Sequence, residues 1–106
     1  MTGADLFQAD LTGLDLSGFD LTGANLTRVD LSGADLFQAD LTEANLTETI
    51  LTWSNMTEAN VGGANLTGAS LTGANLTEAD LKDAILTGAK LTDVIGADLT
   101  GALTDS

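Results

Sequence analysis

One hydrophobic position recurs every five residues along almost the whole chain. Stepping by five from Leu6 to Leu91 gives 18 positions, of which 16 are Leu and the other two are Met56 and Val61. A helix turns about 100° per residue, so residues five apart do not share one stripe, and in a strand an odd spacing alternates between faces. Neither regular element buries all of these side chains, and the pattern instead predicts a chain that bends at a fixed interval.

The other positions of the five-residue unit indicate where the bend falls. A small residue, mostly Ala, stands two places before each Leu, with Asp or Asn between them, as in Ala24, Asn25 and Leu26. Residues two apart point the same way in an extended segment, so the small residue and the Leu face inward and the Asp or Asn faces outward. The next two residues, usually Thr or Ser followed by Gly or Glu, form the bend. We therefore expect outward side chains such as Asn45 and Glu48 to be ordinary solvated surface groups.

This unit resembles that of the pentapeptide-repeat family, in which Ala stands two places before a central Leu or Phe, Asp or Asn just before it, and Ser, Thr or Arg just after it. The likeness runs from Thr2 to about Asp93. It implies an all-β fold, a right-handed quadrilateral parallel β-helix with four units and twenty residues per coil and about five coils. We expect a single domain over residues 1–106, with regular repeats over 2–93.

The repeat changes register near the C-terminus. After Leu91 the next matching segment is residues 97–99, and the slip falls at Gly96. An open solenoid end exposes unpaired strand groups, so it needs a cap or a partner. We interpret residues 94–106 as a terminal cap, and the alternative is an end-to-end homodimer. That dimer would use four apolar residues, Val94, Ile95, Leu99 and Leu103.

Two departures from the repeat point outward in the middle of the chain. Ile50 stands where Asp or Asn is expected, and Trp53 stands where Gly or Glu is usual. With twenty residues per coil, Trp53 lies between Gly33 and Gly73 of the neighbouring coils. This arrangement fits an indole that lies flat over glycines for structural reasons, and it fits equally well a protein interface, because Trp is enriched at binding hot spots.

Two further departures point inward at the N-terminal end, where Leu14 and Phe19 replace the small residue of the repeat. We interpret them as a slightly widened first coil whose end is closed by the Phe19 ring. The alternative is an apolar end that receives another chain.

The charge balance is strongly acidic, since 16 Asp and Glu residues stand against 3 Lys and Arg residues and give a formal net charge of −13. Such a charge repels phosphate backbones and acidic membrane leaflets, so we expect no direct binding to nucleic acid or membranes. High charge often accompanies disorder, but 43% of the residues are apolar and the leucines keep one register. The chain therefore has enough apolar surface to fold.

The residue inventory leaves little catalytic chemistry. Cys and His are absent, which excludes disulfides, thiolate or imidazole metal ligands, and Cys or His catalysis. The carboxylates of Asp5, Asp10, Asp15 and Asp20 are expected on four different sides of a convex rod rather than together in a cleft. The calcium-binding loop and nonapeptide patterns are also missing. We expect no enzymatic activity, no cofactor and no metal site.

These observations favour a non-enzymatic, rigid β-solenoid that acts as a protein-interaction or scaffold module for an unidentified protein partner. The alternative comes from the resemblance: some pentapeptide-repeat proteins are similar to B-DNA in shape and charge and bind DNA gyrase. That likeness implies a DNA-mimicking binder of gyrase or another type II topoisomerase, which inhibits the enzyme or protects it from quinolones. No apolar run is long enough for a membrane span and the first residues lack a signal-peptide pattern, so we expect a cytoplasmic location.

Overall fold

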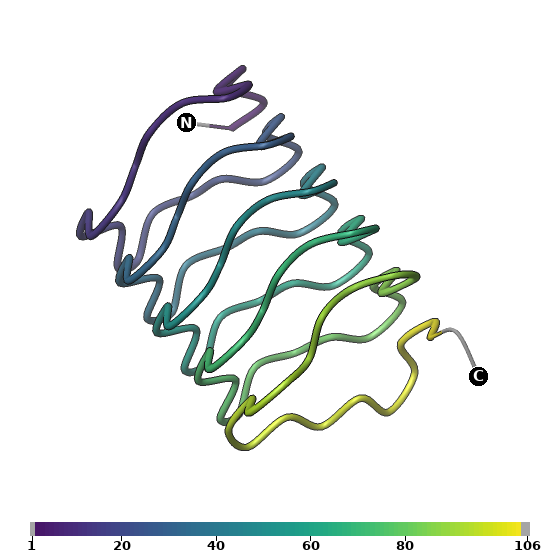
Figure 1. The fold of residues 1–106 in the computed structure, drawn as a ribbon. Helices are drawn as coiled ribbons and strands as arrows, with labels where there is room; N and C mark the ends of the chain where they lie inside the picture. The colour runs from purple at the N-terminus through teal and green to yellow at the C-terminus, as the bar shows by residue number, and fades with distance from the viewer. Residues whose placement is uncertain (1, 105–106) are drawn as a thin grey trace.

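The chain winds into a stack of coils whose first and last turns lie at opposite ends (Figure 1). The structure is a computed structural model, and it describes residues 2–104. Each five-residue unit contributes one tight turn, in which the N–H of the small residue donates to the C=O of the Leu three residues earlier. This bond measures 3.0 Å from Ala24 to Leu21 and 3.0 Å from Ala44 to Leu41. The third residue of each turn has a positive φ, 67° at Gly23, which together with the hydrogen bond is the geometry of a type II β-turn.

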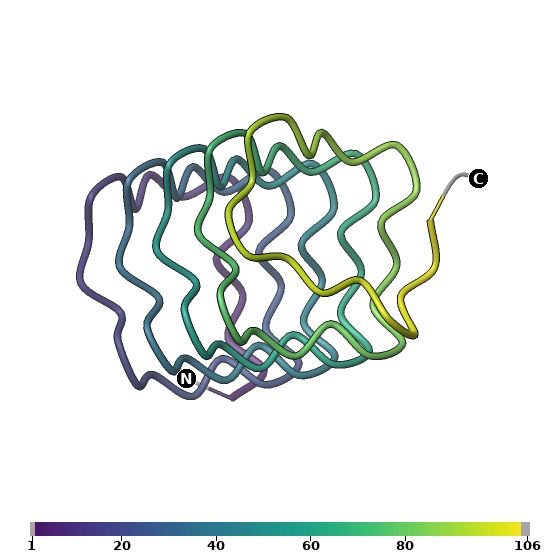
Figure 2. The ribbon, with the colours of Figure 1, turned by 90° about the horizontal axis from the view of Figure 1, so that it is seen from below.

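Successive coils pair in parallel through single β-bridges between residues twenty apart, and Asn45 bridges both Asn25 and Asn65. Leu26 N donates to Asn45 O at 2.8 Å, and Asn45 N donates to Ala24 O at 2.9 Å. Within residues 2–104 the pairing consists of these isolated bridges, with no longer strand and no helix. Figure 2 shows the same coils from below, running side by side along the stack. The predicted coil of twenty residues is thus the repeat that the chain adopts.

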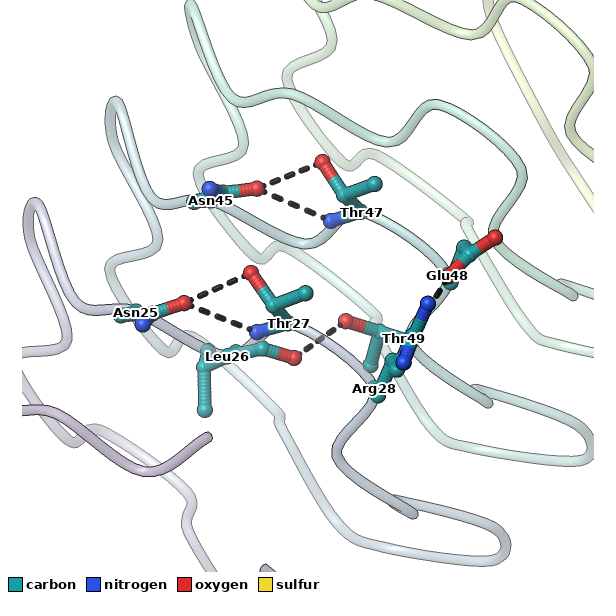
Figure 3. Close-up of polar contacts among 8 residues, drawn as sticks. All are labelled: Asn25, Leu26, Thr27, Arg28, Asn45, Thr47, Glu48 and Thr49. Atoms are coloured by element: carbon teal, nitrogen blue, oxygen red, sulfur yellow. Dashed lines mark hydrogen bonds and ion pairs between the residues drawn. The ribbon is translucent and has the colours of Figure 1, made fainter. Parts of the chain in front are cut away.

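The interior is a continuous apolar column built from the two inward positions of each unit. The central leucines are buried from Leu16 to Leu86, and the small residues between them are buried from Ala24 to Ala84. Two polar side chains share this column. The Thr49 hydroxyl donates to the backbone oxygen of Leu26 at 2.6 Å (Figure 3), which satisfies it inside the core.

The side chain of the Asp or Asn before the Leu accepts hydrogen bonds from the residue two places further on. Asn45 Oδ1 accepts from Thr47 N at 3.1 Å and from Thr47 Oγ1 at 2.6 Å (Figure 3). The same pair of bonds joins Thr27 to Asn25. Because the turn leaves that N–H without a backbone acceptor, the side chain supplies one. Asn45 is exposed, as the sequence predicts, and its side chain also holds the start of the next turn.

The pairing register changes by two residues at the C-terminal end. Asn75 bridges Ile95, twenty residues on, whereas Ile85 bridges Leu103, eighteen residues on. Gly96 lies between the two registers with a φ of 70°, and a Cβ on it would lie 2.5 Å from the hydroxyl oxygen of Thr77. Only glycine fits this close approach without strain.

The C-terminal segment continues the stack at the end opposite the N-terminus (Figure 1). Its apolar residues Val94, Ala97 and Leu99 are partly buried and pack against the core. Leu103 donates through its N–H to Ala84 O at 2.8 Å, so the segment remains hydrogen-bonded to the preceding coil. Residues 105 and 106 of the predicted cap, like residue 1 of the predicted domain, lie outside the described residues.

The N-terminal end is open. Leu14 and Phe19 are 46% and 41% exposed. With neighbouring leucines of the first coil they line a cavity of about 200 Å³. The Phe19 ring lies at this end of the column, where it forms part of the wall of an apolar hollow, and its role as an end plug stays a prediction.

The rod measures 31 Å along its longest axis and 20 Å across in both other directions. Among residues 2–104, no helix has the length and apolar character that crossing a membrane requires.

Candidate interaction surface

One side of the rod carries the two outward apolar residues of the middle coil, and we call it the Trp53 face. Its central column runs along the rod through residues that bridge one another in sequence, Asp10, Asp30, Ile50, Ser70 and Lys90. The two turn columns that border this face have glycine at five of their ten positions, and they are formed by residues 8, 28, 48, 68 and 88 and by residues 13, 33, 53, 73 and 93. Glycine precedes and follows Trp53 in its own column, at positions 33 and 73.

Trp53 is the most prominent side chain on this face. Its backbone φ is 61°, in the region that favours glycine. The indole leans toward the C-terminal end and covers Gly73, where a Cβ would lie 2.5 Å from the indole Cε3. On the other side, a Cβ at Gly33 would meet nothing within 4 Å. The indole therefore rests on one of its two glycines, yet 67% of Trp53 stays exposed.

The same leaning recurs in the two turns before Trp53. The Glu43 side chain lies over Gly63, and the Glu48 side chain lies over Gly68, with Cγ atoms 3.2 and 3.3 Å from the positions of a Cβ. In each case the covered residue stands twenty places further on and is a glycine. In the sequence, each of these contacts corresponds to a long side chain in a turn and a glycine twenty residues later.

Ile50 is the second apolar side chain of the Trp53 face. It is 40% exposed, and it bridges Asp30 on one side and Ser70 on the other. Its position belongs to Asp or Asn elsewhere in the repeat, so it has no side-chain acceptor to offer to the next turn. The two apolar residues predicted as a candidate interface thus lie three residues apart on one side of the rod.

Charge is distributed unequally around the rod. The Trp53 face carries Arg28 and Lys90, two of the three basic residues of the chain. The opposite side, with Lys82 as its basic residue, carries seven carboxylates, namely Asp20, Asp40, Glu43, Glu58, Glu78, Asp80 and Asp83. A protein partner therefore meets a less repulsive potential at the Trp53 face than at the opposite side.

Arg28 and Glu48 form an ion pair on a border of the Trp53 face, with Arg28 Nε 2.8 Å from Glu48 Oε1 (Figure 3). The two side chains are 56% and 52% exposed, so the pair contributes about 0–1 kcal/mol. Within residues 2–104 this is the one ion pair, and Lys90 has no carboxylate partner there.

Hydrogen bonds lower the pKa of three carboxyl groups of the first coil, those of Asp10, Asp15 and Asp20. Hydrogen bonds from the Thr22 side chain and backbone, and then from Thr2, lower the pKa of Asp20 to about 2. The hydroxyl and backbone N–H of Thr12 likewise lower the pKa of Asp10. Each bond is made to the charged form and so favours it. Among the residues that the structure describes, no three acidic side chains come together in a way that could hold a metal ion.

The four apolar residues of the predicted end-to-end interface do not share one environment. Val94 and Leu99 pack against the core, while Ile95 and Leu103 are 54% and 60% exposed. Ile95 and Leu103 occupy bridge positions, so they stand on the sides of the rod. An end-to-end homodimer stays a prediction, and the residues open to a partner in this region are Ile95 and Leu103.

A sequence model of pentapeptide repeats matches the chain in eight copies, over residues 4–42, 24–61, 34–73 and 62–103. The chain belongs to the pentapeptide-repeat family, and its fold is the right-handed quadrilateral β-helix of that family. No curated protein matches it in sequence.

Two solved structures of cyanobacterial proteins are similar to the chain. Rfr23, a pentapeptide repeat protein from Cyanothece 51142, is 33% identical over 91% of this chain and 87% of its own, with a TM-score of 0.51. HetL from Nostoc sp. strain PCC 7120, a pentapeptide repeat protein involved in heterocyst differentiation regulation, is 38% identical over 96% of this chain, with a TM-score of 0.45. The chain spans 47% of the length of HetL.

Full-length QnrB1, a plasmid-mediated fluoroquinolone resistance protein, is also similar to the chain. It is 23% identical over 95% of this chain and 60% of its own, with a TM-score of 0.30. A shared repeat fold does not define a function, so the function has to be argued from the surface.

Proposed function

We propose that this protein is a non-enzymatic protein-interaction or scaffold module that binds its partner through the Trp53 face. The observation that carries the proposal is the exposed pair of Trp53 and Ile50, 67% and 40% exposed, on a side of the rod with fewer unbalanced carboxylates than the opposite side. Large aromatic side chains surrounded by small residues are typical anchors of protein interfaces. A rigid ladder of coils holds this anchor in place, which lowers the entropic cost of binding.

The acidic side chains of the repeat serve structural roles rather than catalytic ones. Their oxygens accept hydrogen bonds from the residue two places on, as at Asp10 and Asp30. General acid and base catalysis needs groups with pKa values pushed apart around one substrate, and these carboxylates lie along the outside of a convex rod, where each accepts hydrogen bonds from its own unit. This supports the non-enzymatic half of the proposal.

The test is a comparison of partner capture by the wild-type chain and by a variant with Trp53→Gly and Ile50→Asn. Both substitutions restore residues that the repeat uses at the same positions, Gly33 and Asn45 for example, so the fold is expected to persist. We expect a protein retained by the wild type in cell extracts to be lost with the variant and kept with Ile95→Asn. Equal capture by all three forms would contradict binding through this face.

The second candidate function is mimicry of DNA toward gyrase or another type II topoisomerase. The observation in its favour is the acidic side of the rod, opposite the Trp53 face, on a body 20 Å across. At 31 Å the rod replaces about nine base pairs at the ~3.4 Å rise of DNA. We expect a strictly monomeric form neither to inhibit supercoiling nor to rescue it from a quinolone at micromolar concentration. Inhibition by a monomer, weakening steeply with salt, would favour mimicry over the scaffold function.

A further inference from the structure

The charge pattern of the central column of the Trp53 face is complementary to itself, and we infer that the partner for this face is a second copy of the chain. In the dimer the two rods lie face to face and antiparallel, with the two-fold axis passing beside Ile50. The inference rests on the proposed function, because it names the partner that the same face would bind. The arguments come from the order of charges, the shape around Trp53 and the area of the face.

The central column begins with the carboxylate of Asp10 and ends with the ammonium group of Lys90, and Ile50 lies at its midpoint. Lys90 lies four coils from Asp10, about 19 Å at the ~4.8 Å spacing of paired strands. Reversing a second rod places Lys90 of each copy opposite Asp10 of the other, Ser70 opposite Asp30, and Ile50 opposite Ile50. A parallel arrangement would instead oppose Asp10 to Asp10, and like charges directly opposite each other are unfavourable.

Asp10 and Lys90 are both accessible for an ion pair between the two copies. Asp10 accepts from Thr12 through Oδ1, with Oγ1 at 2.6 Å, so Oδ2 can accept from an ammonium group. Lys90 is exposed and has no ion-pair partner within residues 2–104. Glu48, which faces its own copy in this arrangement, has its charge offset by Arg28 at 2.8 Å.

The shape around Trp53 also fits a reversed copy. The indole lies over Gly73 of its own chain, and in the antiparallel arrangement the residue opposite Gly73 is Gly33 of the other copy. Gly33 leaves open space within 4 Å of its Cβ position. Each indole is therefore covered by the bare backbone of the opposite rod, and the two indoles pass beside one another without collision.

The area of the face is enough for a reversible dimer. A side of 31 by 20 Å offers about 600 Å² on each copy, so the two copies together bury at most about 1,200 Å². This is the lower limit of specific, stable interfaces. Because each chain carries a net charge of −13, long-range repulsion opposes association, and we expect a dimer that forms at micromolar or higher concentration.

Sedimentation equilibrium and zero-length cross-linking test the inference on the full chain, at ~0.15 M salt where the Debye length is about 8 Å. A carbodiimide joins a Lys amine to a carboxylate only at direct contact, and the chain has two Lys residues, Lys82 and Lys90. We expect a concentration-dependent dimer and a Lys90 to Asp10 cross-link in its peptide map. Within one chain these residues lie too far apart for that bond, so the product reports the dimer.

Three variants test which residues form the dimer interface. Trp53→Gly with Ile50→Asn should weaken the dimer at least tenfold, and Lys90→Asp should do so through the single charge that it reverses. Ile95→Asn is the matched control, since it makes the same change at an exposed bridge position outside the Trp53 face and should leave the dimer intact. A melting curve of each variant confirms that it is folded.

A wild-type chain that stays monomeric to millimolar concentration would overturn the inference. So would a dimer lost with Ile95→Asn but kept with Trp53→Gly, which would place the contact at the C-terminal end. A monomer that nevertheless captures another protein through Trp53 would end the inference and leave the proposed function standing. A dimer through this face with no other partner captured would support the inference alone.

Discussion

Replacing Asn45 by Ala removes a side chain that faces outward yet completes the hydrogen bonds of a turn. Asn45 Oδ1 accepts from the backbone N–H of Thr47 at 3.1 Å and from its hydroxyl at 2.6 Å. An ordinary surface substitution changes stability by less than ~0.5 kcal/mol. Here an N–H that has no backbone acceptor loses its side-chain acceptor, and each neutral hydrogen bond contributes about 0.5–1.5 kcal/mol. We therefore expect Asn45→Ala to lower the free energy of unfolding by about 1–2 kcal/mol.

Urea unfolding followed by circular dichroism measures this change, and thermal unfolding gives a second readout. A loss of 1 kcal/mol lowers the melting temperature by roughly 4–8 °C in a domain of about this size. Asn45→Asp is the matched control, because a carboxylate oxygen accepts the same two bonds and the bridging neighbours Asn25 and Asn65 carry no charge. We expect it to stay near wild type, as should Glu48→Ala, which removes only an exposed ion pair.

Two results would refute this reasoning. If the free energy of unfolding of Asn45→Ala lies within ~0.5 kcal/mol of wild type, water replaces the amide oxygen at no cost and the hydrogen bond does not stabilise the fold. If Asn45→Asp is as destabilising as Asn45→Ala, the loss comes from something other than the acceptor oxygen.

Four further changes test the core, the turns and the acid behaviour. Leu46→Asp places an unpaired charge in the column and should abolish cooperative unfolding in a thermal melt, so a near-normal melt would contradict the inward assignment. Ser54→Ala removes a buried hydroxyl without a partner among residues 2–104 and should raise the unfolding free energy in urea by about 1 kcal/mol. Gly73→Ala should destabilise by about 1 kcal/mol more than Gly33→Ala, because both enter a positive-φ turn but only the first displaces the indole, whose fluorescence should change with it. The pKa of Asp20 is depressed to about 2 in the folded chain, so the contribution of its carboxylate to stability is complete above about pH 4 and is lost as the pH falls toward 2. Asp20→Asn should therefore reduce the dependence of the urea unfolding midpoint on pH over that window.

Much of the fold follows from residues within one five-residue unit. The alternation of a small residue, Asp or Asn, and Leu places two side chains inward and one outward whatever the neighbouring coil contains, and the bend after Leu26 or Leu46 follows from the odd period. The bond from Asn45 to Thr47 is equally local, since its partners are two residues apart. The sequence predicts that Asn45 faces outward, and the structure adds that its oxygen accepts the N–H of Thr47, which has no backbone acceptor.

The candidate surface depended on contacts between coils. The column of five turns predicted that Trp53 lies between two glycines, but not which one it covers, because the lean of the side chain depends on the backbone above and below it. The cross-match of Asp10 with Lys90 appears only when residues eighty apart are aligned along one side of a straight rod. The position of Leu103 likewise followed from a two-residue change of register, which bridge pairing decides. Local composition therefore determined which residues face outward, and the stacking of the coils, through the hydrogen bonds between them, decided which of those residues meet.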